Sequence, residues 1–250
     1  MTPEGDPCPS AKPVEPLRPA IRGRGTAENP ANRFQQVHVT PDPETAAEPG
    51  PQTVYLRDAT KSVLSFNESP DVGFRVALNP YRGCEHGCIY CYARPYHEYL
   101  GLSAGLDFET KILVKERAPE LLADALANEK WEPEPISISG ATDAWQPVEK
   151  KLELTRRCLA VLAACRNPVG IVTKNRLVLR DLDLLQELAE HDAVSVHLTL
   201  TSLDPQITAA LEPRTTRPAG RLDAVRVLAD AGVRVGVLVA PVVPGLTDHE

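Results

Sequence analysis

Short apolar runs alternate with longer amphipathic segments over most of the chain after residue 73. The runs at residues 135–140, 169–173, 193–200 and 233–239 are rich in Val, Ile and Leu and are apolar on both faces, as buried parallel strands are. They lie a few tens of residues apart, which is the spacing of repeated β–α–β units. Residues 73–81 would form the first strand. The pattern predicts an α/β fold with a parallel sheet and right-handed crossovers.

The segments between these runs predict helices that pack on the sheet. Val148, Leu152, Thr155, Leu159 and Leu162 recur at intervals of three and four, which places them on one face of a single helix. Residues 118–130 show a similar pattern. The segment 219–232 ends in a glycine, a residue that readily adopts the left-handed conformation found at helix ends.

Residues 1–52 have a different composition from the rest of the chain. They hold 11 of the 24 prolines and few large apolar residues, so they cannot bury enough surface to offset the entropy of ordering. We predict a disordered N-terminal arm over 1–52, within which residues 21–34 dock on a core domain at 53–250. Because a sheet that approaches a barrel needs one more strand and helix after residue 239, we expect the last βα unit to be missing.

Overall composition narrows the class of protein. The chain has 250 residues, 42% of them hydrophobic, a mean hydropathy of -0.22 and a formal net charge of -7. The N-terminus lacks the features of a signal peptide and no apolar run is long enough to span a membrane, so we predict a cytoplasmic protein without a membrane partner. The negative charge argues against a protein whose affinity for its partner comes mainly from phosphate contacts. A local basic groove is still compatible with it.

The segment RGCEHGCIYCYARP places Cys84, Cys88 and Cys91 in a Cys-x3-Cys-x2-Cys pattern. In a reducing compartment such cysteines favour metal binding over disulfides. Three thiolates do not complete a structural zinc site, so a zinc centre would need His97 as its fourth ligand. A four-iron cluster on three thiolates would instead leave one iron open to a small molecule. We expect His86, between two of the cysteines, to be exposed.

The remaining cysteines do not extend this pattern. Cys158 and Cys165 lie seven residues apart on one predicted helix, and we expect both to be buried in the core. Cys8 falls in the predicted arm, where we expect no function.

The cysteine pattern, with Tyr90 before the third cysteine, resembles the signature of the radical S-adenosylmethionine enzymes. NPYRGCEHGCIYCYARP, GLDFETKILVK and TDAWQPVEKKLELTR are also similar to the branch related to spore photoproduct lyase, from about residue 22 to the end. The resemblance implies a partial (β/α)6 TIM-like barrel with a 4Fe–4S cluster on Cys84, Cys88 and Cys91. It further implies that S-adenosylmethionine, bound to the open iron, is cleaved reductively to a 5'-deoxyadenosyl radical that abstracts hydrogen from a substrate. A flavodoxin or ferredoxin would supply the electron.

The resemblance also implies residues that bind S-adenosylmethionine. Thr142 and Asp143 would hold its amino group, although Asp143 could instead cap the helix near residue 147. Lys174, which could also be a surface lysine, would face the carboxylate. The other candidates are Tyr90 beside the cluster, Thr201 and Ser202 for the ribose or carboxylate unless they serve the local backbone, Arg214 for the carboxylate, and Val239 for the adenine pocket or the core.

The substrate stays open. Spore photoproduct lyase has a cysteine that returns a hydrogen atom, and the matching position here is Ala141, so Tyr90, Tyr92 or Tyr96 would have to relay hydrogen unless they only pack against the cluster. A nucleic acid is implied by the resemblance, and a protein or small metabolite is the alternative. Five arginines after strand ends could form a phosphate-contacting rim: Arg176, Arg180, Arg214, Arg217 and Arg221. The rival hypothesis is a non-catalytic zinc-binding protein or iron–sulfur electron carrier.

Overall fold

The computed structural model describes residues 21–35 and 52–248. Its main feature is a six-stranded sheet in which five neighbouring strands are parallel and one edge strand is antiparallel. The strands, in spatial order, are β2 (Leu64–Phe66), β3 (Val76–Leu78), β6 (Ile136–Ile138), β7 (Val169–Thr173), β8 (Val194–Thr199) and β9 (Arg234–Leu238). The parallel α/β architecture predicted from the alternating pattern is therefore confirmed.

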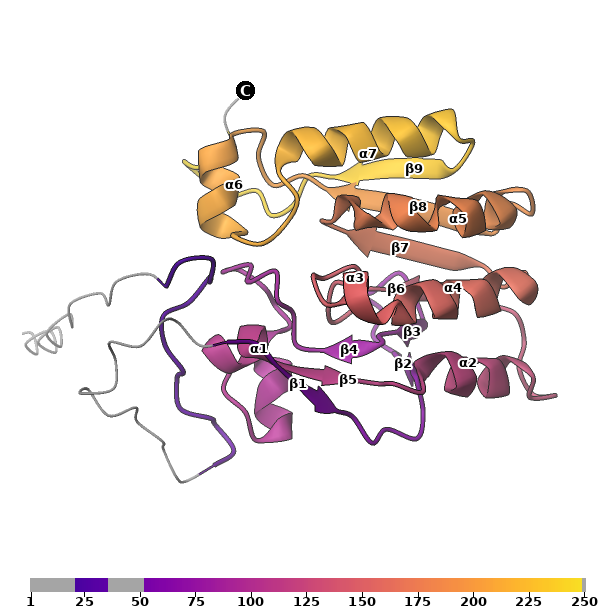
Figure 1. Ribbon diagram of the computed structural model, residues 1–250, viewed down its shortest axis with the longest axis horizontal. Helices are drawn as coiled ribbons and strands as arrows, with labels where there is room; N and C mark the ends of the chain where they lie inside the picture. The colour runs from indigo at the N-terminus through magenta and orange to yellow at the C-terminus, as the bar shows by residue number, and fades with distance from the viewer. Residues whose placement is uncertain (1–20, 36–51, 249–250) are drawn as a thin grey trace, which may run out of the picture.

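The helices lie along the sheet in chain order (Figure 1). They are α2 (Ala118–Leu126), α4 (Leu154–Ala164), α5 (Leu182–Ala189) and α7 (Pro218–Asp230). Their apolar faces and the sheet bury one continuous core, in which Ile136, Ile171 and Leu159 are fully buried. In the parts of the chain that the structure describes, no helix is long and apolar enough to cross a membrane.

A second, smaller sheet that the sequence did not predict takes two strands from the long crossover between β3 and β6 and one strand from the segment before β2. Its strands are β1 (Val54–Arg57), β5 (Lys111–Val114) and β4 (Tyr81–Arg82), with β5 in the middle. The 3₁₀ helix η2 (Arg94–Leu100) and the helix α1 (Leu106–Thr110) lie between β4 and β5. Strands of two to four residues are too short to show a hydrophobic period, which explains why they were missed.

Three details of the prediction are wrong. The expected single helix after residue 147 is two, because Glu153 adopts a left-handed conformation (φ 52°) between α3 (Glu149–Leu152) and α4. Leu152 consequently points outward and is 39% exposed. Strand β9 is largely exposed rather than buried on both faces, and Cys165 is exposed whereas Cys158 is buried. The sequence also did not mark η3 (Arg176–Asp181) or α6 (Pro205–Leu211).

Residues 21–35 lie against η2 and α1, as expected for 21–34. Arg24 donates a hydrogen bond to the Glu109 carbonyl (3.0 Å), Asn29 and Asp107 exchange two hydrogen bonds, and Arg33 pairs with Glu98. The remaining predictions for the arm, including Cys8, lie outside the described residues.

The break at Glu153 yields a stability test. Glu153→Gly removes the cost of a left-handed residue with a Cβ, so we expect the free energy of unfolding to rise by about 0.5–1 kcal/mol. Glu187→Gly, at an exposed position inside α5, should lower it by about 1 kcal/mol. Urea unfolding followed by circular dichroism compares the two, and a loss of stability in both variants would contradict the assignment.

Candidate metal and cofactor site

The three motif cysteines lie on a loop between β4 and η2, beyond the carboxyl end of β3. Cys84 and Cys88 are buried, Cys91 is partly buried, and Cys84 and Cys91 pack with Ala93 and Phe108. Gly83 has a left-handed φ of 81°, and a Cβ there would lie 2.9 Å from the Phe108 carbonyl oxygen. The loop can follow this path only because position 83 carries no side chain.

A buried ion pair fixes the outer side of the loop. The Arg94 guanidinium donates two hydrogen bonds to the Cys88 carbonyl, at 3.0 and 2.9 Å, and pairs with the Glu109 carboxylate at 2.6 Å. Glu109, which is fully buried, also accepts a hydrogen bond from the Gly25 backbone N–H. The segment 21–35 is thereby joined to the cysteine loop.

A second buried carboxylate fixes the inner side of the loop. The backbone N–H of Glu85 donates to the Gln146 side chain (2.9 Å), and its carboxylate accepts from the Val148 N–H (2.9 Å). Gln146 in turn donates to the Gly83 carbonyl (3.1 Å). These contacts hold the loop against the segment that follows β6.

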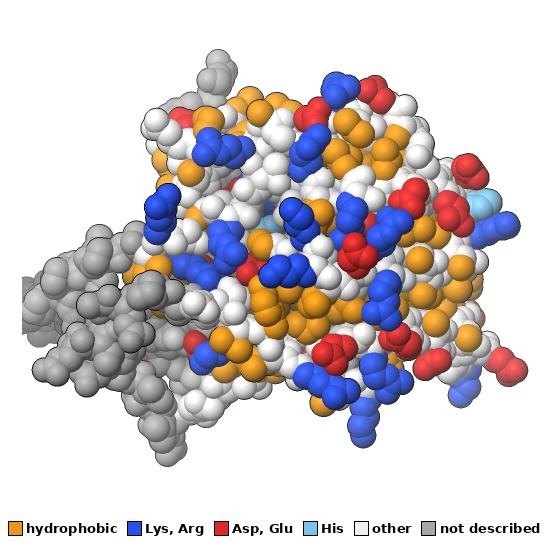
Figure 2. Space-filling model, viewed as in Figure 1, with side chains coloured by type: hydrophobic (Ala, Val, Ile, Leu, Met, Phe, Trp, Pro, Cys, Tyr) orange, Lys and Arg blue, Asp and Glu red, His pale blue; other side chains and the backbone are white. Residues whose placement is uncertain are grey.

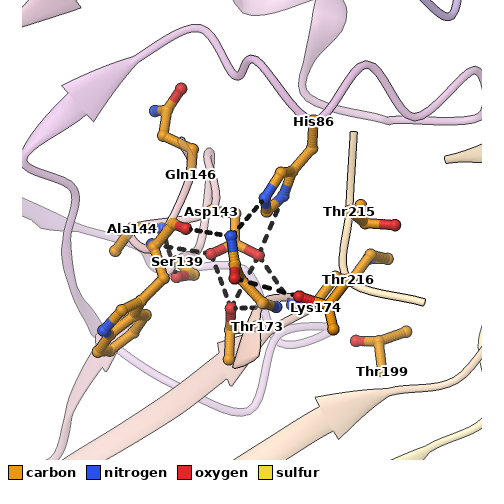
Figure 3. A network of polar contacts seen from close by, with 12 residues as sticks. His86, Ser139, Asp143, Ala144, Gln146, Thr173, Lys174, Thr199, Thr215 and Thr216 are labelled. Atoms are coloured by element: carbon orange, nitrogen blue, oxygen red, sulfur yellow. Dashed lines mark hydrogen bonds and ion pairs between the residues drawn. The ribbon is translucent and has the colours of Figure 1, made fainter. Parts of the chain in front are cut away.

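Asp143, one of the two residues predicted to bind the amino group of S-adenosylmethionine, already forms hydrogen bonds and an ion pair within the protein (Figure 3). Its carboxylate accepts hydrogen bonds from the Thr173 hydroxyl (2.8 Å) and from the backbone N–H groups of Lys174 (2.8 Å) and Trp145 (2.9 Å), and pairs with His86 (3.3 Å). Burial alone would raise its pKa, but His86 and the N–H donors bring the pKa to about 2. Asp143 is therefore an ionised group that holds its surroundings in place.

His86 corrects a prediction. It is 1% exposed rather than exposed, because its ring lies between Asp143 and the Asn175 amide, 3.3 Å from each. A histidine between two cysteines therefore turns inward here and joins the cysteine loop to the end of β7.

Thr142 fits the predicted contact with the amino group of S-adenosylmethionine better than Asp143 does. Among the described residues, its hydroxyl is the one fully buried side-chain polar atom without a hydrogen-bond partner. Such an unsatisfied group costs about 1–3 kcal/mol and in native structures needs an explanation such as a ligand or water. An ammonium donor in front of this hydroxyl would satisfy it.

Lys174 lies beside the cysteines, as the end of β7 predicted. Its ammonium nitrogen lies 5.8 Å from the centre of the Tyr90 ring, within cation–π range. Burial raises the pKa of the Cys88 thiol to about 12, and the nearby Lys174 charge partly opposes this. Lys174 therefore has the charge and the position beside the cysteine loop that the predicted partner of the S-adenosylmethionine carboxylate needs.

A buried network that the sequence did not reveal surrounds Thr201. The hydroxyls of Tyr90 and Thr201 both donate to Glu212, which forms an ion pair with the fully buried Arg221. Burial would raise the pKa of Glu212, but Arg221 and the hydroxyls lower it. The network joins the cysteine loop to the end of β8 and to α7, which leaves the Thr201 hydroxyl committed to the protein.

The other predicted residues are placed as follows. The Ser202 hydroxyl accepts the Asp204 N–H (3.1 Å) and so serves its own turn. Val239 is 65% exposed, and Arg214 pairs with Glu85 (3.3 Å). Two tyrosines are also exposed: Tyr92, whose hydroxyl donates to the Gly140 carbonyl, and Tyr96.

The predicted arginine rim is wrong for Arg221, and other members already form ion pairs with carboxylates. Arg221 is buried, Arg180 pairs with Glu149 and Asp181, and Arg176 pairs with Asp223. On the face shown in Figure 2, basic side chains cross the middle of the molecule but acidic ones lie among and around them. These ion pairs could not be predicted from the fact that the arginines follow strand ends in the sequence.

The donor set fits a cluster better than a single ion. Among the described residues, no three His, Cys, Asp or Glu side chains converge on one ion position. His97, the fourth ligand of the zinc alternative, instead contacts the Lys111 carbonyl (3.0 Å) and the Phe108 ring. In a four-iron cluster each thiolate binds its own iron, so its ligands need not point at one atom. Burial raises the pKa of the Cys84 thiol, so iron would have to displace protons.

The model of the radical SAM superfamily matches residues 78–250, which is more than half of the chain. The chain belongs to the radical SAM superfamily. Its cofactors are accordingly a 4Fe–4S cluster and S-adenosylmethionine.

Two relatives found by sequence are uncharacterised proteins. An uncharacterised protein of Mycobacterium tuberculosis is 39% identical over 175 residues, covering 70% of this chain and 52% of the relative. An uncharacterised protein of Methanocaldococcus jannaschii is 30% identical over 190 residues, covering 76% of this chain and 69% of the relative.

The fold is similar to that of spore photoproduct lyase. The structure of that enzyme complexed with dinucleoside spore photoproduct has a TM-score of 0.55 and 18% identity, covering 76% of this chain and 52% of the other. A double variant of it with bound AdoMet and dinucleoside spore photoproduct has a TM-score of 0.53 and 18% identity. This chain spans about half the length of the mycobacterial relative and of spore photoproduct lyase.

The buried pair of Glu212 and Arg221 yields a prediction on stability. Arg221→Met leaves a carboxylate buried without its partner, so we expect a loss of about 3–5 kcal/mol in the free energy of unfolding. Arg226→Met removes two exposed ion pairs from the same helix and should cost much less. If urea unfolding showed the same loss in the free energy of unfolding for both variants, the buried pair would stabilise the fold no more than the exposed ion pairs do.

The same pair predicts a dependence on pH. Because the folded protein lowers the pKa of Glu212, the ionised group stabilises the fold above its unfolded pKa, and this stabilisation is lost as pH falls through the folded pKa. The stability difference between wild type and Glu212→Gln should therefore be largest near neutral pH and shrink below about pH 4. A difference that stays constant from pH 7 to pH 3 would contradict the lowered pKa.

Proposed function

We propose that this chain binds a 4Fe–4S cluster through Cys84, Cys88 and Cys91 and cleaves S-adenosylmethionine reductively. The observation that carries the proposal is the set of three motif thiols, with no fourth ligand beside them in the described residues, next to the unsatisfied hydroxyl of Thr142. When bound, the cluster would supply one electron to the sulfonium of S-adenosylmethionine, whose carbon–sulfur bond would break to give methionine and a 5'-deoxyadenosyl radical able to abstract a hydrogen atom from the substrate. We further propose that the parallel sheet is part of a partial (β/α)6 barrel.

The chain's own residues would bind and orient the cofactor. The Thr142 hydroxyl accepts a hydrogen bond from the amino group, and the Lys174 ammonium pairs with the carboxylate. Asp143 acts as a positioning residue, since its carboxylate fixes the backbone of Lys174 and the ring of His86. Tyr90 holds the loop between Cys88 and Cys91 through its hydrogen bond to Glu212. These contacts keep the site rigid, so that little reorganisation is needed when the cofactor binds.

The electron and the substrate come from outside the chain. A flavodoxin or ferredoxin would serve as electron donor. Spore photoproduct lyase acts, by its name, on spore photoproduct, which one of its structures holds as a dinucleoside, but its likeness to this chain is one of fold. The engaged arginines described above do not support phosphate contacts at the predicted rim, and Ala141 carries no thiol to return hydrogen.

Cysteine variants test the cluster. After anaerobic reconstitution and reduction, Cys84→Ala, Cys88→Ala and Cys91→Ala should each abolish release of 5'-deoxyadenosine from S-adenosylmethionine, measured by chromatography. Cys165→Ala changes an exposed cysteine outside the motif and should keep the wild-type rate. Release that persists in any motif variant would reject the assignment. Zinc in place of iron, with collapse of the fold in these variants, would favour the structural-metal alternative.

Thr142 tests the cofactor contact separately. Loss of a hydrogen bond to a charged group costs about 1.5–3 kcal/mol, so Thr142→Val should weaken S-adenosylmethionine binding by about 10- to 100-fold, measured by equilibrium dialysis. Thr142→Ser keeps the hydroxyl and should bind within a few-fold of wild type. Equal binding by the Val and Ser variants would exclude the contact.

A further inference from the structure

A cavity of about 340 Å³ lies directly beside the cysteine loop. Gly83 and Ala93, which flank the motif cysteines, line one wall, and Ala141 and Thr142 line another. Tyr81, Phe108 and Tyr96 supply aromatic surface. Small-molecule sites have this size, and polar and apolar side chains line this cavity in similar measure.

Lys115 is the more deeply buried of the two cationic residues that line this cavity, and Arg82 is the other. Lys115 follows β5, is 8% exposed, and among the described residues has no carboxylate within ion-pair distance. The nearby Asp58 is taken up by Arg82, whose guanidinium lies 2.7 Å from it. Burial, reinforced by Arg82, lowers the pKa of Lys115 to about 8, so the amine is still mainly protonated at neutral pH. Because no ion pair neutralises this ammonium among the described residues, an anion that enters the cavity can pair with it.

A second cavity, of about 450 Å³, adjoins the first and shares Lys115 and Thr60 with it. Lys61 and Arg117 line this second cavity, where the Glu116 carboxylate is paired with Arg57. Together the two cavities present five cationic side chains against two carboxylates, although the whole chain has a net charge of -7. Such local positive charge in an acidic protein selects for anions.

We propose that the two cavities form a binding site for a small organic anion, whose phosphate or carboxylate group pairs with Lys115 while its apolar body lies among Tyr81, Phe108 and Tyr96. The far end of the ligand then lies against Thr142, in the segment assigned to S-adenosylmethionine. That this anion is the substrate rests on the proposed radical function, whereas its binding does not. The site would take a small molecule rather than a duplex.

The first experiment uses simple probes with the reconstituted protein. Phenyl phosphate and benzoate carry the two candidate anionic groups on an aromatic body, and benzyl alcohol is their neutral counterpart. Calorimetric titration should show saturable binding of at least one anion, and the tighter anion identifies the group. Binding of neither anion, or equally tight binding of benzyl alcohol, would overturn the proposal.

Variants locate the binding. Lys115→Met removes the charge but keeps the length, and should weaken binding of the anion at least tenfold. Lys151→Met, on the exposed surface of α3, should leave affinity within twofold. An unchanged affinity in Lys115→Met, or an equal loss in both variants, would contradict the site.

A measurement on the wild-type protein avoids any folding defect of Lys115→Met. Trinitrobenzenesulfonate labels accessible amines, and peptide mass spectrometry should show that phenyl phosphate or benzoate protects Lys115 while Lys151 is labelled as before. Absence of protection at saturating anion would overturn the proposal. Release of 5'-deoxyadenosine, assayed on the same preparation, separates the two proposals. Protection without release rejects the radical function alone, and release without anion binding rejects this site alone.

Discussion

The fixed path of the cysteine loop is the constraint on which the rest of the site depends. Three thiols on one short loop can serve one cofactor only if the loop has a single conformation, and buried charges impose it. Arg94 and Glu109 hold its outer side, and Glu85 with Gln146 holds its inner side. Because buried charges that lose a partner are strongly destabilising, the loop cannot shift without breaking these contacts.

The same kind of interaction joins the loop to the ends of the parallel strands. Asp143 connects the segment after β6 to Thr173 and Lys174 at the end of β7 (Figure 3), and Glu212 connects Tyr90 to Thr201 after β8. Although burial alone would raise the pKa of each carboxylate, its hydrogen-bond and ion-pair partners lower the pKa and keep the group ionised. The site therefore combines rigid, internally satisfied groups with two that ligands can reach, the unsatisfied hydroxyl of Thr142 and the unpaired ammonium of Lys115.

The sequence predicted what depends on local pattern. The parallel strands, most of the helices and the three grouped cysteines follow from hydrophobic period and spacing. Lys174 follows directly on a strand as expected, and its contact with the cofactor stays a prediction. Ion pairs between distant residues have no local signal, so Arg221 was misread as part of a surface rim and His86 as exposed. The left-handed turn at Glu153 and the short strands of the small sheet were missed because three or four residues do not establish a period.

The central claim is that three cysteines hold a 4Fe–4S cluster with one iron left for S-adenosylmethionine. Electron paramagnetic resonance of the reduced, reconstituted protein tests it most directly. We expect the signal of a reduced four-iron cluster, and a change in its shape and g values when S-adenosylmethionine is added, because the cofactor binds the open iron. A cluster signal that S-adenosylmethionine leaves unchanged, or a protein that takes up zinc and no iron, would contradict the account.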